Sequence, residues 1–168
     1  YKIRDFLREK GLTIVPCVNP DGVEIAIHGS DAALKYKSLV EKASKENKVW
    51  QANARGVDIN HNFNAGWNEL KNRELSMNIK APSATRFGGN APESEPETKA
   101  LTNLCKRYNI SVPEDIATGG GFKDWFIEKF RRPALTIEMG KGKNPLPLSD
   151  FEPEYKIMLN MLCLGVIV

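Results

Sequence analysis

Histidine and closely spaced cysteines are scarce in this sequence. Its 168 residues include two histidines, His28 and His61, and three cysteines without a C-x-x-C pair. Catalytic zinc sites draw heavily on histidine, while thiolate zinc sites and disulfide frameworks need paired cysteines. The chain therefore has few residues from which a self-contained zinc site or a disulfide framework could be built.

A large excess of one charge and a long apolar run are absent as well. Lys and Arg number 24 against 21 Asp and Glu, a net charge of +3. A nucleic-acid partner would require a concentrated basic face. The apolar tail from Met158 to Val168 is much shorter than the about 20 residues of a membrane-spanning helix. We expect neither a nucleic-acid partner nor a membrane span.

The three cysteines, Cys17, Cys105 and Cys163, are far apart in the chain. We expect buried or half-buried free thiols, which are typical of a reducing compartment. This cysteine usage favours a cytoplasmic location, which is otherwise left open, and no secretory signal is visible at the charged start. The first residue is Tyr1 rather than Met, and we expect the chain to begin partway into a longer protein. The oligomeric state is left open.

The remaining composition is that of a folded domain, with 41% hydrophobic and 27% charged residues. Two apolar runs without alternation, Leu12–Val18 and Ala134–Glu138, predict strands buried on both faces. Asn19–Gly22 predicts a turn between elements, and Val49–Trp67 a long structured loop. Helices are predicted over 3–10, within 31–48, after a capping box at Ser94 and Glu97, over 122–130 and after Asp150. Helices alternating with buried strands predict an α/β fold.

Glu138 is the most informative carboxylate, because it ends a predicted buried strand. Ligands of open α/β sheets bind beside the carboxyl ends of the strands. A partly desolvated carboxylate at that place could act as a general base. A solvated glutamate at a strand end fits the same pattern.

A polar cluster occupies the predicted loop, and aromatic residues surround it. It could bind a substrate carboxylate through an arginine fork and amide donors, or it could be a loop that bonds to itself through Asx turns. His61 within it could titrate near neutral pH or bind a ligand, whereas His28 is interpreted as structural. The triple glycine 119–121 is a weak signal for anion binding. The cluster consists of Asn53, Arg55, Asp58, Asn60, His61 and Asn62.

Several of these motifs, in this order, resemble the zinc carboxypeptidase family. Within that family the chain is most similar to bacterial γ-D-glutamyl-meso-diaminopimelate peptidases, which cut cell-wall peptides. The resemblance implies a three-layer αβα fold around a mixed, mostly parallel sheet, in one domain spanning 1–168. The segments that carry it are 15–23, 52–60, 86–89, 94–97, 120–127 and 140–147.

The resemblance also implies roles for individual residues. In the family a zinc ion activates water and polarises the scissile carbonyl, and a glutamate takes the proton of the water. Glu138 matches that general base, and Asn60 matches an asparagine that binds the substrate carboxylate. An arginine steadies the oxyanion; Arg55 is the candidate, although Gln51 lies nearer the expected offset from Trp50. The residue after the asparagine is commonly Arg, and here it is His61, which favours the wall-peptide branch.

The zinc ligands of the family have no counterpart in this sequence. There is no His-x-x-Glu pair. The segment that would carry the third ligand and the active-site tyrosine is missing between Tyr108 and the triple glycine. We therefore expect a truncated, incomplete domain with no zinc at the family site. The predicted function is that of a zinc-dependent wall-peptide hydrolase whose present chain is inactive; the alternative is a peptide-binding or purely structural remnant.

Overall fold

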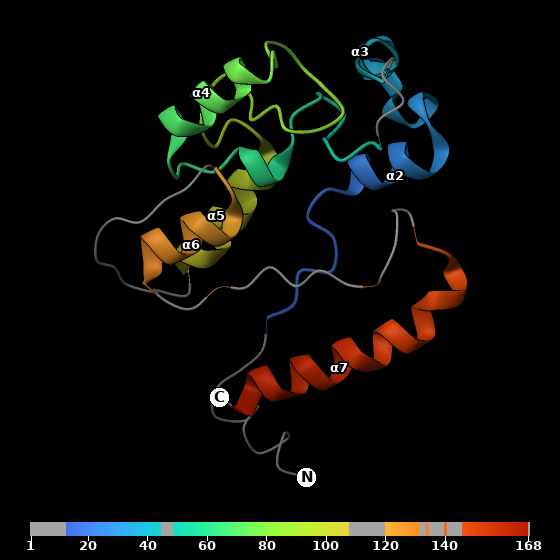
Figure 1. The fold of residues 1–168 in the computed structure, drawn as a ribbon, viewed down its shortest axis with the longest axis vertical. Helices are drawn as coiled ribbons and strands as arrows, with labels where there is room; N and C mark the ends of the chain where they lie inside the picture. The colour runs from blue at the N-terminus through green and yellow to red at the C-terminus, as the bar shows by residue number, and fades with distance from the viewer. Residues whose placement is uncertain are drawn as a thin grey trace. The chain divides into compact units, whose positions relative to one another are not determined.

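The computed structural model describes residues 13–44, 49–107, 120–131, 134, 140 and 146–167. The chain divides into two compact units, one made of residues 17–135 and the other of residues 1–16 with 136–168. Figure 1 shows that the described ranges consist of helices and irregular segments. The predicted strand Ala134–Glu138 lies outside them except for Ala134.

The first helix of the larger unit is α2 (Pro20–His28). At this helix and in the segment before it, the structure differs from two predictions. The predicted turn Asn19–Gly22 is the start of this helix: Asn19 Oδ1 accepts a hydrogen bond from Gly22 N, and Pro20 occupies the first helical position. Residues 13–18, predicted as a buried strand, are irregular, and Ile14 is 69% exposed. An extended segment is stabilised as a strand only by pairing, and no partner strand occurs in the ranges described.

Gly22 allows α2 to approach the neighbouring loop closely. A Cβ atom at this position would lie 2.4 Å from the carbonyl oxygen of Ala52. Asn19 Nδ2 also donates a hydrogen bond of 3.1 Å to the Gln51 carbonyl. The start of α2 is thus fixed against the loop around residue 52.

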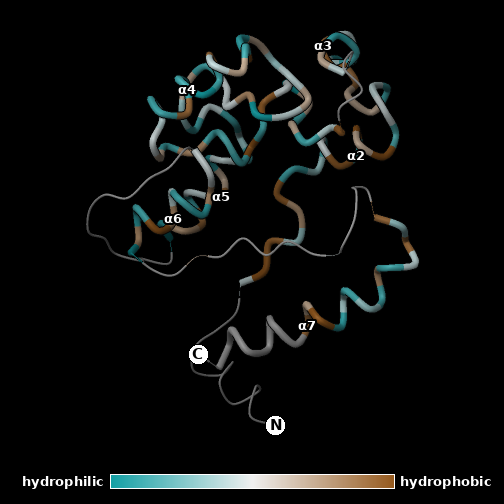
Figure 2. The backbone as a smooth tube through the Cα atoms, in the orientation of Figure 1, coloured by the Kyte–Doolittle hydropathy of each residue, from teal (hydrophilic) through white to brown (hydrophobic). Residues whose placement is uncertain are grey.

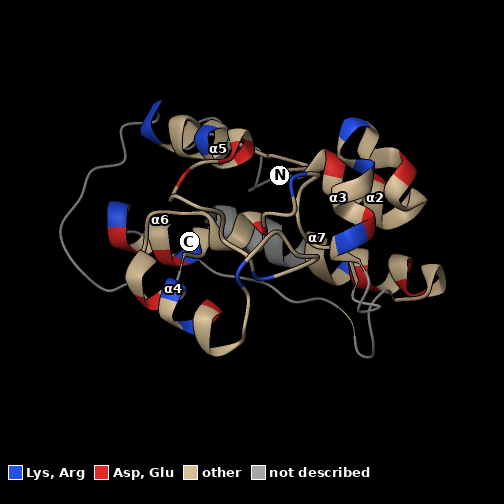
Figure 3. Cartoon of the chain, turned by 90° about the horizontal axis from the view of Figure 1, so that it is seen from above, with Lys and Arg blue, Asp and Glu red and all other residues tan. Residues whose placement is uncertain are grey.

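Two short helices, η1 (Ser30–Tyr36) and α3 (Lys37–Ala43), confirm the helix predicted within 31–48, with a kink at Leu34. Figure 3 shows both acidic and basic residues on the described helices. The inner faces pack on the predicted loop, which is well ordered, as expected. This first core is formed by Ile25, Ala33, Val40, Trp50, Ala52, Ala54 and Ala84.

Helix α4 (Trp67–Ser76) is hydrophilic along most of its length in Figure 2 and buries only Leu70 and Glu74. Glu74 is 3% exposed; it accepts hydrogen bonds of 2.7 Å from Lys71 Nζ and from the amide of Gly88. These bonds attach the helix to the segment that follows it. A buried carboxylate is tolerated here because each of its oxygens has a donor.

Helix α5 (Pro96–Arg107) begins without the predicted capping box. Ser94 Oγ donates to Glu95 Oε1 and accepts a hydrogen bond from Asn62 Nδ2, and the Glu97 carboxylate lies 3.5 Å from Asn53 Nδ2. Pro96 is the first helical residue, a position that proline favours because its missing N–H is not needed there. Both side chains of the predicted box are directed toward the loop instead.

Helix α6 (Phe122–Phe130) has the predicted bounds, and its aromatic face completes the second core. Phe63 contacts the rings of Phe122 and Trp125 at centroid distances of 5.2 and 5.6 Å. Leu101 of α5 packs on the same cluster. This core holds the loop, α5 and α6 together.

The smaller unit contains η3 (Leu148–Asp150) and α7 (Phe151–Ile167). The helix follows Asp150 directly, as predicted. Ile157 on this helix is 53% exposed. None of the helices described is long and apolar enough to cross a bilayer.

The second core gives a stability prediction for Phe63, which is 1% exposed. Phe63→Ala removes a ring that touches two other aromatic residues, and we expect it to lower the free energy of unfolding by about 3–5 kcal/mol. Leu75→Ala, at a side chain 62% exposed on α4, is the control and should change it by less than about 0.5 kcal/mol. Urea unfolding curves of the two variants test this; equal losses would contradict the assignment of the core.

Candidate functional site

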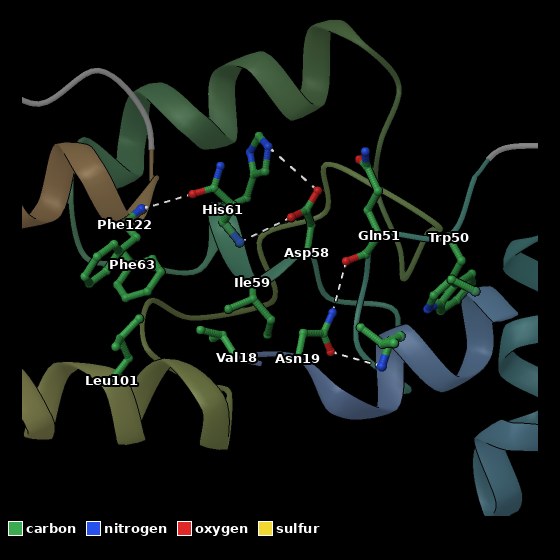
Figure 4. Close-up of a pocket in the computed structure, with 14 residues that line it drawn as sticks. Val18, Asn19, Trp50, Gln51, Asp58, Ile59, His61, Phe63, Leu101 and Phe122 are labelled. Carbon is green, nitrogen blue, oxygen red and sulfur yellow. Dashed lines mark hydrogen bonds and ion pairs between the residues drawn. The ribbon is translucent and has the colours of Figure 1, made fainter. Parts of the chain in front are cut away.

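A cavity of about 570 Å³ lies in the unit of residues 17–135. Figure 4 shows it between the start of α2, the loop through η2 (Ile59–His61), α5 and the start of α6. Three sequence motifs, 15–23, 52–60 and 120–127, all contribute wall residues to it. Segments far apart in the sequence thus form one site. The wall includes Val18, Asn19, Trp50, Gln51, Asp58, Ile59, Asn60, His61, Phe63, Leu101 and Phe122.

Asn60 lies on the wall of this pocket and is exposed. Its Oδ1 accepts a hydrogen bond of 3.2 Å from the backbone amide of Phe122, the first residue of α6. One of the free N–H groups at the start of this helix is therefore satisfied by a loop residue distant in sequence. With Oδ1 in use, Nδ2 is the remaining hydrogen-bonding group of this side chain.

His61 lies beside Asn60 with its side chain 29% exposed. Its Nε2 is 3.8 Å from Asp58 Oδ2, and its Nδ1 is buried without a hydrogen-bond partner in the described part of the chain. Asp58 is 6% exposed, and its oxygens accept hydrogen bonds from the amides of Asn60 and Arg86 and from Thr85 Oγ1. The carboxylate is therefore fixed by the backbone, and the imidazole is held less tightly.

Arg55 lies outside the pocket wall, on the other side of the loop. Its Nε and Nη2 donate to the same oxygen of Glu95, at 2.8 and 2.7 Å. Glu95 is 2% exposed and also accepts a hydrogen bond of 2.7 Å from Asn53 Nδ2. The hydrogen bond from Arg55 to Glu95 raises the pKa of the guanidinium. Gln51, the alternative oxyanion residue, lies on the pocket wall.

The polar cluster of the loop contains side chains that bond within the loop and side chains that line the pocket. Asn53 Oδ1 accepts hydrogen bonds from the amides of Arg55 and Val57, and Asn62 Nδ2 donates to the Gly88 and Ala91 carbonyls. These side chains hold the loop in shape, whereas Asn60 and His61 face the pocket. Residues that hydrogen-bond within the protein and residues that line the pocket therefore occur in the same segment of the loop.

Four further expectations concern residues that are not among the wall residues named above. His28 is exposed and lies 3.5 Å from Glu24 on α2. Cys105 is buried, as expected, and its burial raises the pKa of the thiol; Cys17 is exposed, contrary to expectation. Glu138 lies outside the described residues. In the triple glycine, Gly120 N donates to the Ala65 carbonyl, so this amide is not free for an anion.

Sequence reasoning missed two groups on which the site depends. Glu95, in the S-E-P-E segment, was noticed only as part of a motif, and its burial between Arg55 and Asn53 has no local sequence signal. Trp50 was used only to count an offset, yet its ring is 7% exposed on the pocket wall. An aromatic residue within a polar loop was the available signal for it.

Comparison with known proteins identifies the family. Residues 1–116 match the zinc carboxypeptidase family, and the chain belongs to it. Gamma-D-glutamyl-L-diamino acid endopeptidase 1 of Lysinibacillus sphaericus is 34% identical over 196 residues, covering 92% of this chain and 48% of the relative. Murein peptide amidase A of Escherichia coli is 27% identical over 134 residues (73% and 46%), and human mast cell carboxypeptidase A is 38% identical over 71 residues (38% and 16%). No solved structure matches the chain.

These comparisons confirm the predicted family and place it in the α/β class. The predicted three-layer arrangement around a sheet is not confirmed, because the described ranges of the structure contain no strand. The chain spans about half the length of the first of these relatives.

The family is zinc-dependent, so the described residues must be compared with the needs of a zinc site. No group of three or more His, Cys, Asp or Glu side chains within the described ranges could hold a metal ion. On the pocket wall, His61 and Asp58 are the side chains of these types, and the oxygens of Asp58 already accept three hydrogen bonds. The residues described do not fit a zinc site, and we derive no catalytic step through the metal.

The Glu97 carboxyl yields a pH prediction, since burial raises its pKa above the ordinary value. Such a group favours folding when protonated, below its unfolded pKa, and this contribution is lost as the pH rises through the folded pKa. We therefore expect Glu97→Gln to be more stable than the wild type at pH 7, and this advantage to disappear near pH 4. Glu93→Gln is the control. Urea midpoints at both pH values measure the effect; an advantage that grows on acidification would contradict it.

Proposed function

We propose that this chain supplies the peptide-binding part of a metallocarboxypeptidase-family domain and binds peptides of the bacterial cell-wall type in the pocket of Figure 4. The observation that carries the proposal is the convergence of the segments 15–23, 52–60 and 120–127 on this pocket. These three segments are far apart along the chain. Two relatives are named for action on such compounds, a gamma-D-glutamyl-L-diamino acid endopeptidase and a murein peptide amidase.

Within the pocket, Asn60 and His61 would bind a carboxylate of the peptide. The cap on Phe122 uses Oδ1 of Asn60, which leaves Nδ2 as a donor to an anionic oxygen. His61 can add a second donor from the same wall, and Asp58 orients it at 3.8 Å. Apolar wall residues such as Ile59 and Leu101 would cover the aliphatic part of the ligand.

The hydrolytic reaction of the family is proposed for the complete domain rather than for the present chain. In that reaction Glu138 is the proposed general base, and Gln51 or Arg55 the group beside the oxyanion. The position of Gln51 on the pocket wall, and the engagement of Arg55 with buried Glu95, support Gln51 of the two. We propose that the chain as it stands does not catalyse zinc-dependent hydrolysis.

An internal segment absent from this chain supports the proposed inactivity. The alignment to the endopeptidase extends over 196 residues, more than the 168 of this chain, although it covers only 92% of it. The alignment therefore includes positions at which the chain has no residue. The sequence predicts such a gap between Tyr108 and the triple glycine, where the family places its third zinc ligand.

Asn60→Asp tests the carboxylate site, because aspartate keeps an acceptor for the Phe122 amide but replaces the Nδ2 donor by a negative charge. We expect binding of a γ-D-glutamyl-meso-diaminopimelate peptide to weaken about tenfold or more, measured by isothermal titration calorimetry. Asn68→Asp, at an exposed position on α4, introduces the same charge away from the pocket and should bind like the wild type. Unchanged binding by Asn60→Asp with an unchanged urea midpoint would refute the site.

A metal and activity assay tests the proposed inactivity. We expect the purified chain, incubated with zinc and dialysed, to retain no stoichiometric zinc and not to hydrolyse the same peptide. The metal content is measured by atomic emission and the products by chromatography. Stoichiometric zinc, together with hydrolysis that Glu138→Gln abolishes, would contradict the proposal.

A further inference from the structure

A second pocket of about 410 Å³ lies next to the first and shares a wall residue with it. Gln51 lines both pockets, and its Oε1 accepts a hydrogen bond of 2.5 Å from Thr85 Oγ1, which lines the second. The Thr85 oxygen also lies 3.2 Å from Asp58 Oδ2, on the wall of the first pocket, so the single hydroxyl proton has two neighbouring acceptors. The walls of the second pocket are Val49, Gln51, Met77, Ile79, Ser83, Thr85 and Arg86.

Arg86 is the cationic residue of the second pocket. One of its guanidinium nitrogens lies 3.4 Å from the sulfur of Met77, a weak acceptor, and within the described ranges it forms no ion pair with a carboxylate. By contrast, Arg55 is bound to Glu95 and Lys71 to Glu74. An exposed arginine with most of its donors available can bind an anionic oxygen pair in a two-pronged geometry.

The backbone of Arg86 is held in a conformation that costs energy. Its φ is +68°, in the left-handed region, which is unfavourable for a residue with a Cβ. The amide of Arg86 donates a hydrogen bond of 2.8 Å to Asp58 Oδ2, and Asp58 N donates to the Phe87 carbonyl at 2.8 Å. The same aspartate therefore anchors Arg86 and orients His61. Strained residues fixed in this way are concentrated at binding sites.

We propose that the peptide site continues past Gln51 into the second pocket, where Arg86 binds a second carboxylate of the ligand. The ligand class is then a peptide with two separated carboxylates, one at Asn60 and His61 and one at Arg86. Gln51 lies between the two positions and can donate from its Nε2 to the connecting amide. The inference rests on the proposed peptide-binding function and specifies the charge pattern of the peptide.

A pair of peptides that differ in one group tests the second carboxylate. The first is γ-D-glutamyl-meso-diaminopimelate; in the second, the distal carboxylate of diaminopimelate is a carboxamide. We expect the wild type to bind the first about tenfold more tightly, as measured by isothermal titration calorimetry, because the charge-assisted hydrogen bonds to Arg86 are lost with the amide. Arg86→Gln should bind both peptides with the affinity that the wild type has for the amide.

A matched control is available on α4. Arg73→Gln removes the same charge from an exposed residue that lines neither pocket, and should keep the tenfold preference. An equal effect of Arg86→Gln on both peptides, or no effect on either, would overturn the role of Arg86. If Asn60→Asp still weakens both peptides in that case, the carboxylate site of the first pocket stands. If the wild type binds neither peptide, both proposals fail.

Discussion

The buried carboxylate of Glu95 is the interaction on which the loop around the pocket depends. Burying a charge is costly unless the group is paired and fully hydrogen-bonded. Here Arg55, Asn53 and Ser94 all donate to it, and the Glu95 amide donates to Asn62 Oδ1. Removal of Arg55 would leave this buried charge without its cationic partner, and removal of Asn53 or Ser94 would leave it with one donor fewer. The shape of the segment between residues 53 and 62 therefore follows from an acidic residue that precedes α5.

Because of this anchoring, some side chains of the loop hydrogen-bond within the protein while others line the pocket. The side chains of Asn53, Asp58 and Asn62 accept or donate within the protein, so their amides and carboxylate are not available to a ligand. Asn60 and His61 are turned to the pocket by the same loop. A binding surface of this kind needs no metal to be rigid. Its affinity for a peptide can therefore be considered separately from the hydrolytic reaction of the family.

The sequence predicted those parts of the fold that are set by local chemistry. The bounds of α6 and the structured loop over 49–67 follow from motifs and turn residues. The strand over 12–18 does not form within the described residues, because a strand requires a partner that no local pattern supplies. The capping box failed for a related reason: Ser94 and Glu97 have the right spacing, but Asn62 and Asn53 compete for them. The position of Glu138, the most specific prediction from the family resemblance, lies outside the described residues.

Gly120 has a consequence for how this domain tolerates changes in length. Its carbonyl accepts a hydrogen bond from Phe63 N and its amide donates to the Ala65 carbonyl, so the entry to α6 is fixed by the loop rather than by the chain that leads to it. The cost of closing a connection grows only slowly with its length. The connection between α5 and Gly120 can therefore lose or gain residues in evolution while Phe122 keeps its place against Asn60. A relative can differ in length here and retain the same pocket wall.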